Sequence, residues 1–252
     1  MTTDTVPKET AVAARIGDSK FTIGGVAKGS GMIHPELATM FCFLTTDAPV
    51  ELDFLKSALR KAVDASFNMI SVDGDTSPSD MVLIMANGLA GNKPISPGSR
   101  QADTFQQALD RVCIYLAKAI AGDGEGATKL IEVTVNGATS AAEARLAART
   151  VVSSPLVKAA VHGADPNWGR IIVAAGRSGV ELVESNIDLN IGDVSVVKGG
   201  RPLPFSEQSV VRVLKQSEVP ISLQLNLGTA TATAWGCDLS EEYVTINSQY
   251  TS

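Results

Sequence analysis

The sequence predicts an α/β protein, because segments with the two-residue periodicity of strands alternate with segments that have the periodicity of amphipathic helices. The alternation contains no internal repeat. With 252 residues, the chain can bury a substantial core in one large domain or two smaller ones. With 44% hydrophobic and 19% charged residues, its composition is typical of a soluble globular protein.

The first half begins with an expected hairpin, in which strands at residues 10–16 and 20–27 flank the turn residues Gly17 and Asp18. An amphipathic helix is expected at residues 51–67, because Leu52, Leu55 and Leu59 fall on one of its faces. The other elements expected in this half are strands at residues 40–44, 68–72 and 81–86, and a long helix at 101–121 that ends at Gly122.

The second half is expected to start as α/β and to become β-rich. A strand at residues 129–136 precedes an alanine-rich helix at 141–150 and, after a loop at 163–169, a short helix at 171–175. Strands are then expected at residues 187–191, 194–197, 221–227, 229–234 and 242–246. A boundary near residues 176–179 would divide the chain into a domain at 1–177 that bears the nucleophile described below and a smaller β-rich domain at 178–252.

Charge and cysteine content exclude several classes of partner. The formal net charge is −6, and no basic cluster offsets it, so neither nucleic acid nor an anionic membrane is an expected partner. Three scattered cysteines suggest neither a disulfide framework nor a zinc site, and a reducing compartment fits them. No apolar run reaches membrane-spanning length, and the start has no targeting pattern. We therefore expect a cytoplasmic protein with no metal and no cofactor.

The segment from Lys28 to Met40, with the sequence KGSGMIHPELATM, ends in a hydroxyl group that could become a nucleophile. A threonine inside a chain has no base to activate it, but cleavage before Thr39 would free an α-amine with a pKa of about 8 that could accept the hydroxyl proton. Ala38 offers an unobstructed carbonyl, and Gly29 permits backbone angles that other residues avoid. From the residues alone, Thr39 could equally be a β-branched residue that opens a buried strand.

This segment resembles the self-cleavage region of the bifunctional ornithine acetyltransferase/glutamate N-acetyltransferase family of arginine biosynthesis, in which the threonine after an alanine is the nucleophile. Further segments agree with that family in order along the chain. They are residues 2–5 with 7–9, 71–77, 124–129, 163–170 and 243–252. One departure is that Met1 falls on an internal position of the family, so the N-terminal part of the family is expected to be missing.

The resemblance implies a layered αββα sandwich like that of N-terminal-nucleophile hydrolases, with a smaller β-rich C-terminal domain. It also implies self-cleavage between Ala38 and Thr39, after which Thr39 takes the acetyl group of N-acetylornithine and passes it to glutamate. Some members of the family also accept acetyl-coenzyme A as the donor. The two cleaved chains are expected to form a heterotetramer, with the missing N-terminal segment supplying the oxyanion hole.

The resemblance also assigns the substrate-binding residues, which are Thr2, Lys28, Thr39, Glu125, Asn247 and Ser252. Without it, Glu125 is a solvated loop carboxylate and Lys28 a surface cation. With it, Glu125 is expected to pair with the ornithine ammonium group, and Lys28 to hold the carboxylate of an amino-acid substrate or to lower the pKa of the α-amine.

Two other functions fit the same residues. One is an amidohydrolase or aminopeptidase with the same threonine nucleophile and water as the acceptor. The other is a truncated, non-catalytic subunit. A cation site at Asp73, Asp75 and Asp80 is rejected because the loop lacks the glycine and the distal glutamate of a calcium loop. His34 and His162 have neither a nucleophile nor a second histidine at motif spacing, so a histidine triad or a zinc site is not expected.

Overall fold

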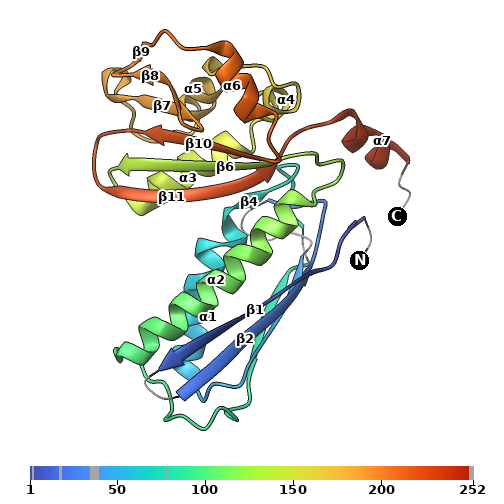
Figure 1. The fold of residues 1–252 in the computed structure, drawn as a ribbon, viewed down its shortest axis with the longest axis vertical. Coiled ribbons are helices and arrows are strands. Elements are labelled where there is room, and N and C mark those ends of the chain that lie inside the picture. The colour runs from blue at the N-terminus through green and yellow to red at the C-terminus, as the bar shows by residue number, and fades with distance from the viewer. Residues whose placement is uncertain (2, 17–18, 35–39, 78, 250–252) are drawn as a thin grey trace. The chain divides into compact units, whose positions relative to one another are not determined.

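The computed structural model describes residues 1, 3–16, 19–34, 40–77 and 79–249, and the chain divides into two compact units (Figure 1). The first unit comprises Met1–Asn68 and Asp75–Ile120, and the second comprises Met69–Gly74 and Ala121–Ser252. Each unit has a sheet of its own, with four strands in the first and seven in the second among the described residues. Because strands and helices are mixed in both units, the predicted α/β class is confirmed.

The four-stranded sheet brings one end of three strands together. Its order is β1 (Lys8–Ile16), β2 (Ser19–Lys28), β3 (Phe41–Thr46) and β5 (Met81–Ala86). Strand β2 is antiparallel to both β1 and β3, whereas β3 and β5 run parallel. In this register Lys28 pairs with Phe41, which pairs with Met81. The end of β2 therefore lies beside the beginnings of β3 and β5.

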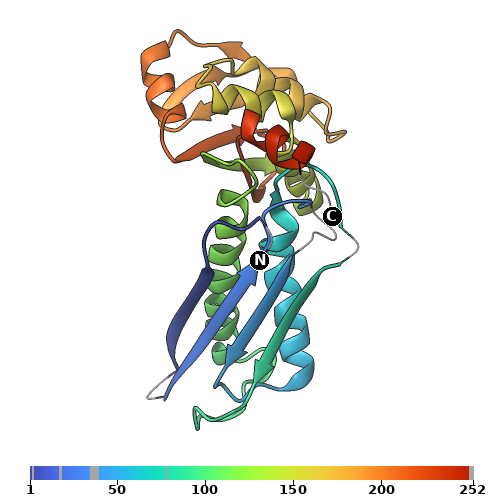
Figure 2. The ribbon, with the colours of Figure 1, turned by 90° about the vertical axis from the view of Figure 1, so that its right-hand side faces the viewer.

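Two helices, α1 (Leu52–Ala65) and α2 (Arg100–Gly122), cover one face of this sheet (Figure 2). Phe105 of α2 contacts Phe21 of β2 and Phe54 of α1, with ring centroids 5.7 Å and 6.0 Å apart. Gly25 of β2 permits α2 to lie close to the sheet, because a Cβ atom there would lie 2.9 Å from the side chain of Leu116 in α2. The two helices and the hairpin were all predicted from the sequence.

The opposite face of the four-stranded sheet carries exposed apolar side chains. Val26, Phe43 and Leu83 form one row across β2, β3 and β5, and their exposed fractions are 47%, 39% and 40%. Met81 and Met85 add 40% and 52% exposed side chains on either side of that row. One face of this sheet is thus a closed core and the other is an apolar surface.

The seven-stranded sheet of the second unit is built around β6 (Leu130–Ala138). Its order is β4 (Ile70–Ser71), β11 (Ala230–Cys237), β6, β10 (Glu218–Gln224), β7 (Asp188–Ile191), β8 (Val194–Lys198) and β9 (Arg201–Pro202). Strand β6 is parallel to β10 and antiparallel to β11. Helix α3 (Ala141–Val152) packs on β6 and β11. The side chain of Ser140 begins α3 by accepting a hydrogen bond from the Glu143 amide.

The remaining helices of the second unit are α4 (Pro155–His162), α5 (Gly169–Gly176), α6 (Glu207–Leu214) and α7 (Glu241–Gln249). Short 3-10 turns occur at Phe67–Met69 and Glu184–Asn186. Sequence analysis predicts α5 but misses α4 and α6, although Pro155 stands at a position typical of a helix start. None of the helices in the described ranges combines the length and the apolarity that a membrane span requires.

Besides these missed helices, two sequence predictions differ from the structure. The expected strand at residues 242–246 is wrong, because these residues lie within α7. Their β-branched side chains favour a strand, but Glu241 and Glu242 in the first turn stabilise a helix start through its dipole. The division into units also does not follow the predicted boundary at residues 176–179, because β7 to β10 join the same sheet as β6.

Candidate functional site

The positions assigned by resemblance fall into two groups. Thr2, Ala38, Thr39 and Ser252 lie outside the described residues. Lys28, Glu125 and Asn247 are described, the first in one unit and the other two in the second unit.

Lys28 lies at the end of β2, next to the strand that follows Thr39 in the sequence. Its half-buried side chain places Nζ 5.0 Å from the centroid of the Phe41 ring. A cation over an aromatic face is held by the ring quadrupole. Because Phe41 follows Met40, the sheet register keeps a positive charge near the start of β3.

The N-terminal segment contacts the loop that follows Lys28. Asp4 accepts hydrogen bonds of 2.7 Å from the Gly29 amide and from the Lys8 ammonium group. Thr3 and Ser30 share a hydroxyl hydrogen bond of 2.5 Å. The side chains of Asp4 and Lys8 are 1% and 0% exposed, so this ion pair is buried. Two segments quoted separately for the family resemblance are therefore in direct contact.

Asp80 anchors the residue that follows the predicted nucleophile. Its Oδ1 accepts a hydrogen bond of 2.9 Å from the amide of Met40. Burial raises the pKa of Asp80 to about 6, although the Met40 amide and the charge of Lys28 oppose that rise. Its Oδ2 is buried and has no hydrogen-bond partner in the described part of the chain. The sequence placed Asp80 only in the rejected cation site, so this contact is not predicted by it.

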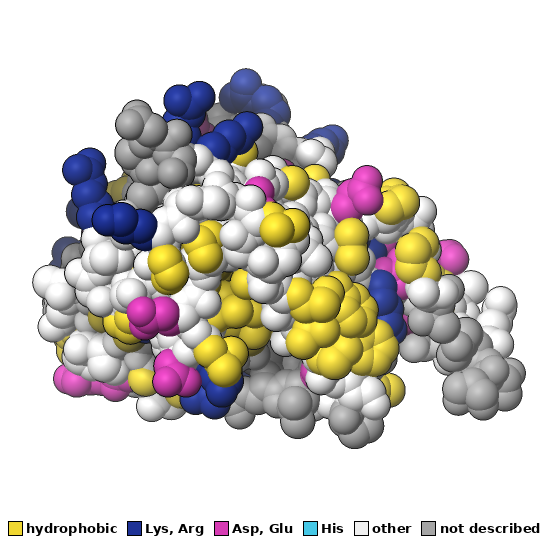
Figure 3. Space-filling model, turned by 90° about the horizontal axis from the view of Figure 1, so that it is seen from below, with side chains coloured by type: hydrophobic (Ala, Val, Ile, Leu, Met, Phe, Trp, Pro, Cys, Tyr) yellow, Lys and Arg dark blue, Asp and Glu magenta, His cyan; other side chains and the backbone are white. Residues whose placement is uncertain are grey.

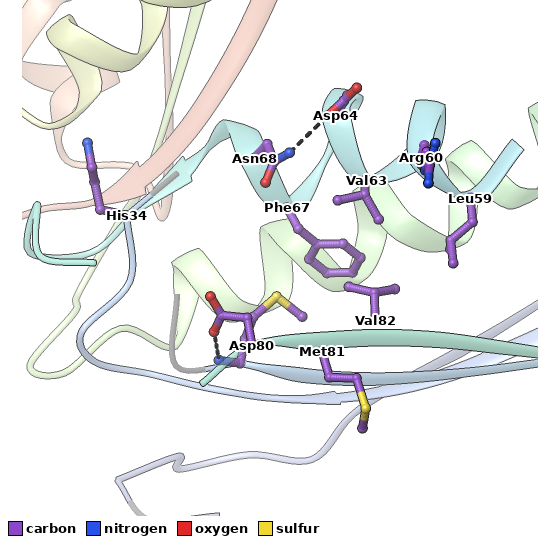
Figure 4. Close-up of a pocket in the computed structure, with 11 residues that line it drawn as sticks. His34, Leu59, Arg60, Val63, Asp64, Phe67, Asn68, Asp80, Met81 and Val82 are labelled. Carbon is purple, nitrogen blue, oxygen red and sulfur yellow. Dashed lines mark hydrogen bonds between the residues drawn. The ribbon is translucent and has the colours of Figure 1, made fainter. Parts of the chain in front are cut away.

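Asp80 lines a cavity of about 570 Å³ within the first unit (Figure 4). Figure 4 shows Val63 and Phe67 directed toward the strand that carries Val82, whereas Met81 points away from them. The other residues that line the cavity are His34, Met40, Leu59, Arg60, Asp64 and Asn68. The cavity combines an apolar wall with ionisable side chains of both signs, so it is a candidate site for a small polar ligand.

In the second unit, Glu125 and Asn247 are in contact. The side-chain amide of Asn247 donates a hydrogen bond of 2.8 Å to Glu125 Oε2 and another of 3.0 Å to the carbonyl of Tyr243. Glu125 stands in the loop after α2, and Asn247 lies in α7. Two residues that the resemblance assigns to substrate binding are thus brought together from distant parts of the sequence.

The loop that carries Glu125 is packed tightly against α7. Gly126 has a φ of +69°, and a Cβ atom at this position would lie 2.5 Å from the Tyr243 amide nitrogen. Ser240 donates a hydrogen bond of 2.6 Å to the Gly126 carbonyl. Glycine is therefore required both by the backbone conformation and by the close approach.

Asp238 fixes the other end of the same loop. One carboxylate oxygen accepts from the amides of Thr128 and Lys129 at 2.8 Å and 2.9 Å. The other oxygen is bonded to the Thr128 hydroxyl at 2.5 Å and lies 2.7 Å from Nδ1 of His162. Burial alone raises the pKa of Asp238, but these hydrogen bonds outweigh it and hold the pKa below its usual value.

Sequence analysis misses the pairing of Asp238 with His162. The two residues are 76 positions apart, so no local motif could reveal their contact. His162 also lies 3.3 Å from the exposed carboxylate of Glu241 at the start of α7. Within the described ranges, no group of three or more His, Cys, Asp or Glu side chains is placed to hold a metal ion.

Comparison with known proteins agrees with the resemblance along the whole chain. A model of the ArgJ family matches residues 1–252. The arginine biosynthesis bifunctional protein ArgJ of Symbiobacterium thermophilum is 55% identical over 250 residues, which are 99% of this chain and 62% of that protein. The protein of the same name from Dehalococcoides mccartyi is 53% identical over all of this chain and 62% of its own length. The present chain thus spans about 62% of the length of these relatives.

A solved structure shows a similar fold. The chain resembles the arginine biosynthesis bifunctional protein ArgJ of Bacillus halodurans with a TM-score of 0.81 and 48% identity, over 82% of this chain and 98% of that one. This likeness confirms the predicted fold class, an α/β fold of the N-terminal-nucleophile hydrolase type.

Proposed function

Because the chain belongs to the ArgJ family, we propose that it transfers the acetyl group of N-acetylornithine to glutamate through Thr39, as a step of arginine biosynthesis. The contact between Glu125 and Asn247 carries this proposal. These residues are 122 positions apart, and the family resemblance assigns both to the substrate site. Their hydrogen bond of 2.8 Å supports a shared binding surface in the second unit.

The first step is self-cleavage of the precursor. The Thr39 hydroxyl attacks the Ala38 carbonyl, the peptide bond between them breaks, and the Thr39 nitrogen takes up the hydroxyl proton. Water then hydrolyses the resulting ester, which leaves an Ala38 carboxylate, a free Thr39 hydroxyl and a new α-amine.

The second step is acetyl exchange in two halves. The α-amine of Thr39 removes the proton of its own hydroxyl, which attacks the acetyl carbonyl of N-acetylornithine and releases ornithine. Glutamate then attacks the acetyl-threonine ester through its amino group, takes the acetyl group and frees the hydroxyl. An ester intermediate predicts ping-pong kinetics. Acetyl-coenzyme A is a second donor to be compared in the same assay.

Lys28 and Glu125 would bind the ends of the substrate. Glu125 is acidic and half-buried, so it suits the side-chain ammonium group of ornithine. Lys28 offers a positive charge at the sheet edge next to Met40, where it would attract a substrate carboxylate and lower the pKa of the α-amine.

The proposal includes a partner segment that contributes the oxyanion hole. The chain spans about 62% of its relatives' length, and nothing in it resembles the threonine-glycine pair that serves this purpose in the family. The exposed row of Val26, Phe43 and Leu83 supports such a partner, because an apolar sheet face suits a further layer of protein. Hydrophobic side chains at the surface are visible in Figure 3. With this segment, the two cleaved chains would form the proposed heterotetramer.

A cytoplasmic location is also part of the proposal. It is supported by Cys42, Cys113 and Cys237, which are all free and buried, as expected in a reducing compartment.

An acetyl-transfer assay tests the proposed function. The purified chain is incubated with N-acetylornithine and glutamate, with and without the separately produced N-terminal part of the S. thermophilum relative, and mass spectrometry follows cleavage after Ala38. We expect two fragments and formation of N-acetylglutamate when the added segment is present. Release of free acetate instead would indicate a hydrolase. No product under either condition would indicate a non-catalytic subunit.

A further inference from the structure

The loop that carries Glu125 is held closely on both sides of that residue. A Cβ atom on Gly124 would lie 2.8 Å from the Cys237 sulfur, and one on Gly126 would lie 2.5 Å from the Tyr243 amide nitrogen. Residues larger than glycine do not fit so close to their neighbours. The backbone on either side of Glu125 is therefore fixed against the end of β11 and the first turn of α7.

The segment between β11 and α7 holds this loop with hydrogen bonds. Ser240 donates a hydrogen bond of 2.6 Å to the Gly126 carbonyl. Asp238 accepts from the amides of Thr128 and Lys129 at 2.8 Å and 2.9 Å. The exposed fractions of Asp238 and Ser240 are only 2% and 7%. Because water is largely excluded, these hydrogen bonds are stronger than they would be at the surface.

Helix α7 depends on the same contacts within the second unit. The structure describes all of its residues, and none of them is buried. Most helices in proteins are stabilised by packing of an apolar face, whereas α7 buries no such face. The side-chain amide of Asn247 instead donates a hydrogen bond of 2.8 Å to Glu125 Oε2. The loop and the helix therefore hold each other, and Asp238 anchors the loop.

A carboxylate that is held in one place can select a ligand by its length. In N-acetylornithine, a fixed number of bonds separates the acetyl group from the ammonium group. N-acetyllysine with its acetyl group on the α-nitrogen is longer by one C–C bond of about 1.5 Å. A charge-assisted hydrogen bond requires a separation of about 2.7–2.9 Å, so a fixed Glu125 pairs well with only one of the two ammonium groups.

We propose that Asp238 is a positioning residue that sets the specificity of the substrate site: by fixing the loop of Glu125, it makes the site select the side-chain length of ornithine over that of lysine. This inference rests on the proposed function, since it takes Glu125 as the group that binds the ornithine ammonium. Asp238 acts only through Glu125 and does not itself contact the substrate.

The test measures kcat/KM for N-acetylornithine and for N-acetyllysine with the chain supplied with the N-terminal part of the S. thermophilum relative. The wild-type protein should prefer the ornithine compound by about 10–200-fold. Asp238→Ala removes the acceptor of the Thr128 and Lys129 amides, so the loop can follow the longer ligand. The preference should then fall about 10-fold. Asp238→Asn keeps an accepting oxygen and should retain most of the preference.

A milder variant keeps the test decisive if Asp238→Ala does not fold. Ser240→Ala removes only the hydrogen bond to the Gly126 carbonyl, so it should lower the preference by about threefold. An unchanged preference in every folded variant of the two residues, with equal losses for both substrates, would indicate a purely structural role and overturn the inference.

Asp188→Ala is the matched control for a loss of stability. Asp188 also fixes a turn of the second unit, because it accepts hydrogen bonds of 2.8 Å from the Gly199 amide and 2.7 Å from the Lys198 ammonium group. Its removal should lower the urea midpoint of unfolding and leave the preference unchanged. A changed preference in this variant would mean that any loss of stability relaxes specificity, and would overturn the inference.

Glu125→Gln tests whether Asp238 acts through Glu125. The preference should already be small in this variant, and adding Asp238→Ala should not lower it further, because residues that act as one unit are not additive. A further fall of the preference in the double variant would overturn the inference.

Titration calorimetry with the two acetylated amino acids separates this inference from the proposed function, because binding requires no turnover. A wild-type protein that binds the ornithine compound more tightly but transfers no acetyl group would count against the proposed function. The ratio of the two Kd values in the same variants would then decide the inference by the same criteria. A wild-type protein that binds both compounds equally, or neither, would overturn the inference.

Discussion

The two units treat a buried carboxylate in opposite ways. In the second unit, Asp238 accepts four hydrogen bonds, and its pKa is held below the usual value. In the first unit, Asp80 accepts one hydrogen bond within the described ranges, from Met40, and burial raises its pKa to about 6. The first arrangement stabilises the fold, whereas the second leaves Oδ2 of Asp80 without a partner among the described residues.

This difference indicates a division of labour. A fully bonded carboxylate holds the loop of Glu125 in one conformation, which suits a binding surface. An incompletely bonded carboxylate is typical of a site where stability is sacrificed for chemistry. We therefore expect changes at the sheet edge of the first unit to alter kcat, and changes in the Glu125 loop to alter KM or stability.

The largest effect is expected at the nucleophile. Thr39→Ala should abolish cleavage after Ala38 and lower acetyl transfer by about 10³-fold or more, because the attacking hydroxyl is lost. Mass spectrometry and the acetyl-transfer assay measure both effects. Thr39→Ser is the comparison variant, because it keeps the hydroxyl and the α-amine and should retain part of both activities. Retention of acetyl transfer in Thr39→Ala would contradict the mechanism. It would also contradict the division between a catalytic first unit and a binding second unit.

The next largest effect is expected in the backbone of the Glu125 loop. Gly126→Ala combines a φ of +69° with a Cβ atom 2.5 Å from the Tyr243 amide nitrogen, so it should destabilise the second unit by about 3 kcal/mol. Gly74→Ala is a matched control in the same unit, because its φ is +86° and no atom lies within 4 Å of the added carbon. It should cost about 1 kcal/mol. Urea unfolding of both variants measures the difference, and equal losses would mean that the close approach is unimportant.

A smaller effect is expected on substrate binding. Glu125→Gln should weaken N-acetylornithine binding by about 1.5–3 kcal/mol, since a charge-assisted hydrogen bond to the ornithine ammonium group is lost. Cleavage after Ala38 should continue at the wild-type rate, because it involves no substrate. The apparent KM for N-acetylornithine checks the first expectation. An unchanged KM would return Glu125 to the role of a solvated loop residue.

The smallest expected effect distinguishes the two carboxylates by sign. The folded-state pKa of Asp238 is lowered, so its stabilisation is complete above the unfolded carboxyl pKa of about 4 and is lost as the pH falls through the folded value. Asp238→Asn should therefore cost about 1.5 kcal/mol at pH 7, and this difference should shrink in acid.

Asp80 should show the reverse. Its folded-state pKa of about 6 exceeds the unfolded value of about 4, so ionisation of Asp80 destabilises the fold. This destabilisation grows as the pH rises from about 4 and is complete above about 6. Asp80→Asn should then raise the unfolding midpoint at pH 8 and leave it unchanged at pH 4. Unfolding curves at the two pH values measure both variants. If Asp80→Asn and Asp238→Asn both lowered the unfolding midpoint at pH 8, the two carboxylates would not differ in their effect on stability.

Local patterns in the sequence were sufficient for most of the fold. The hairpin, α1, α2 and α3 follow from periodicity and from end signals such as Gly122, because these features depend on residues close together in the chain. Residues 242–246 were misassigned because their β-branched side chains favour a strand, whereas the first turn of α7 is stabilised by acidic residues next to them. The unit boundary was missed because strand pairing between β6 and β10 joins residues about 90 positions apart.

The sequence by itself determined the α/β class, the family and the candidate nucleophile, since each is written in a contiguous stretch such as residues 28–40. Only the tertiary structure decided that Asp80 holds Met40, that Asp238 pairs with His162, and that Asn247 meets Glu125. These contacts join residues 40, 76 and 122 positions apart. Which polar groups meet depends on how the sheets bring distant segments together and exclude water, and no local spacing encodes that.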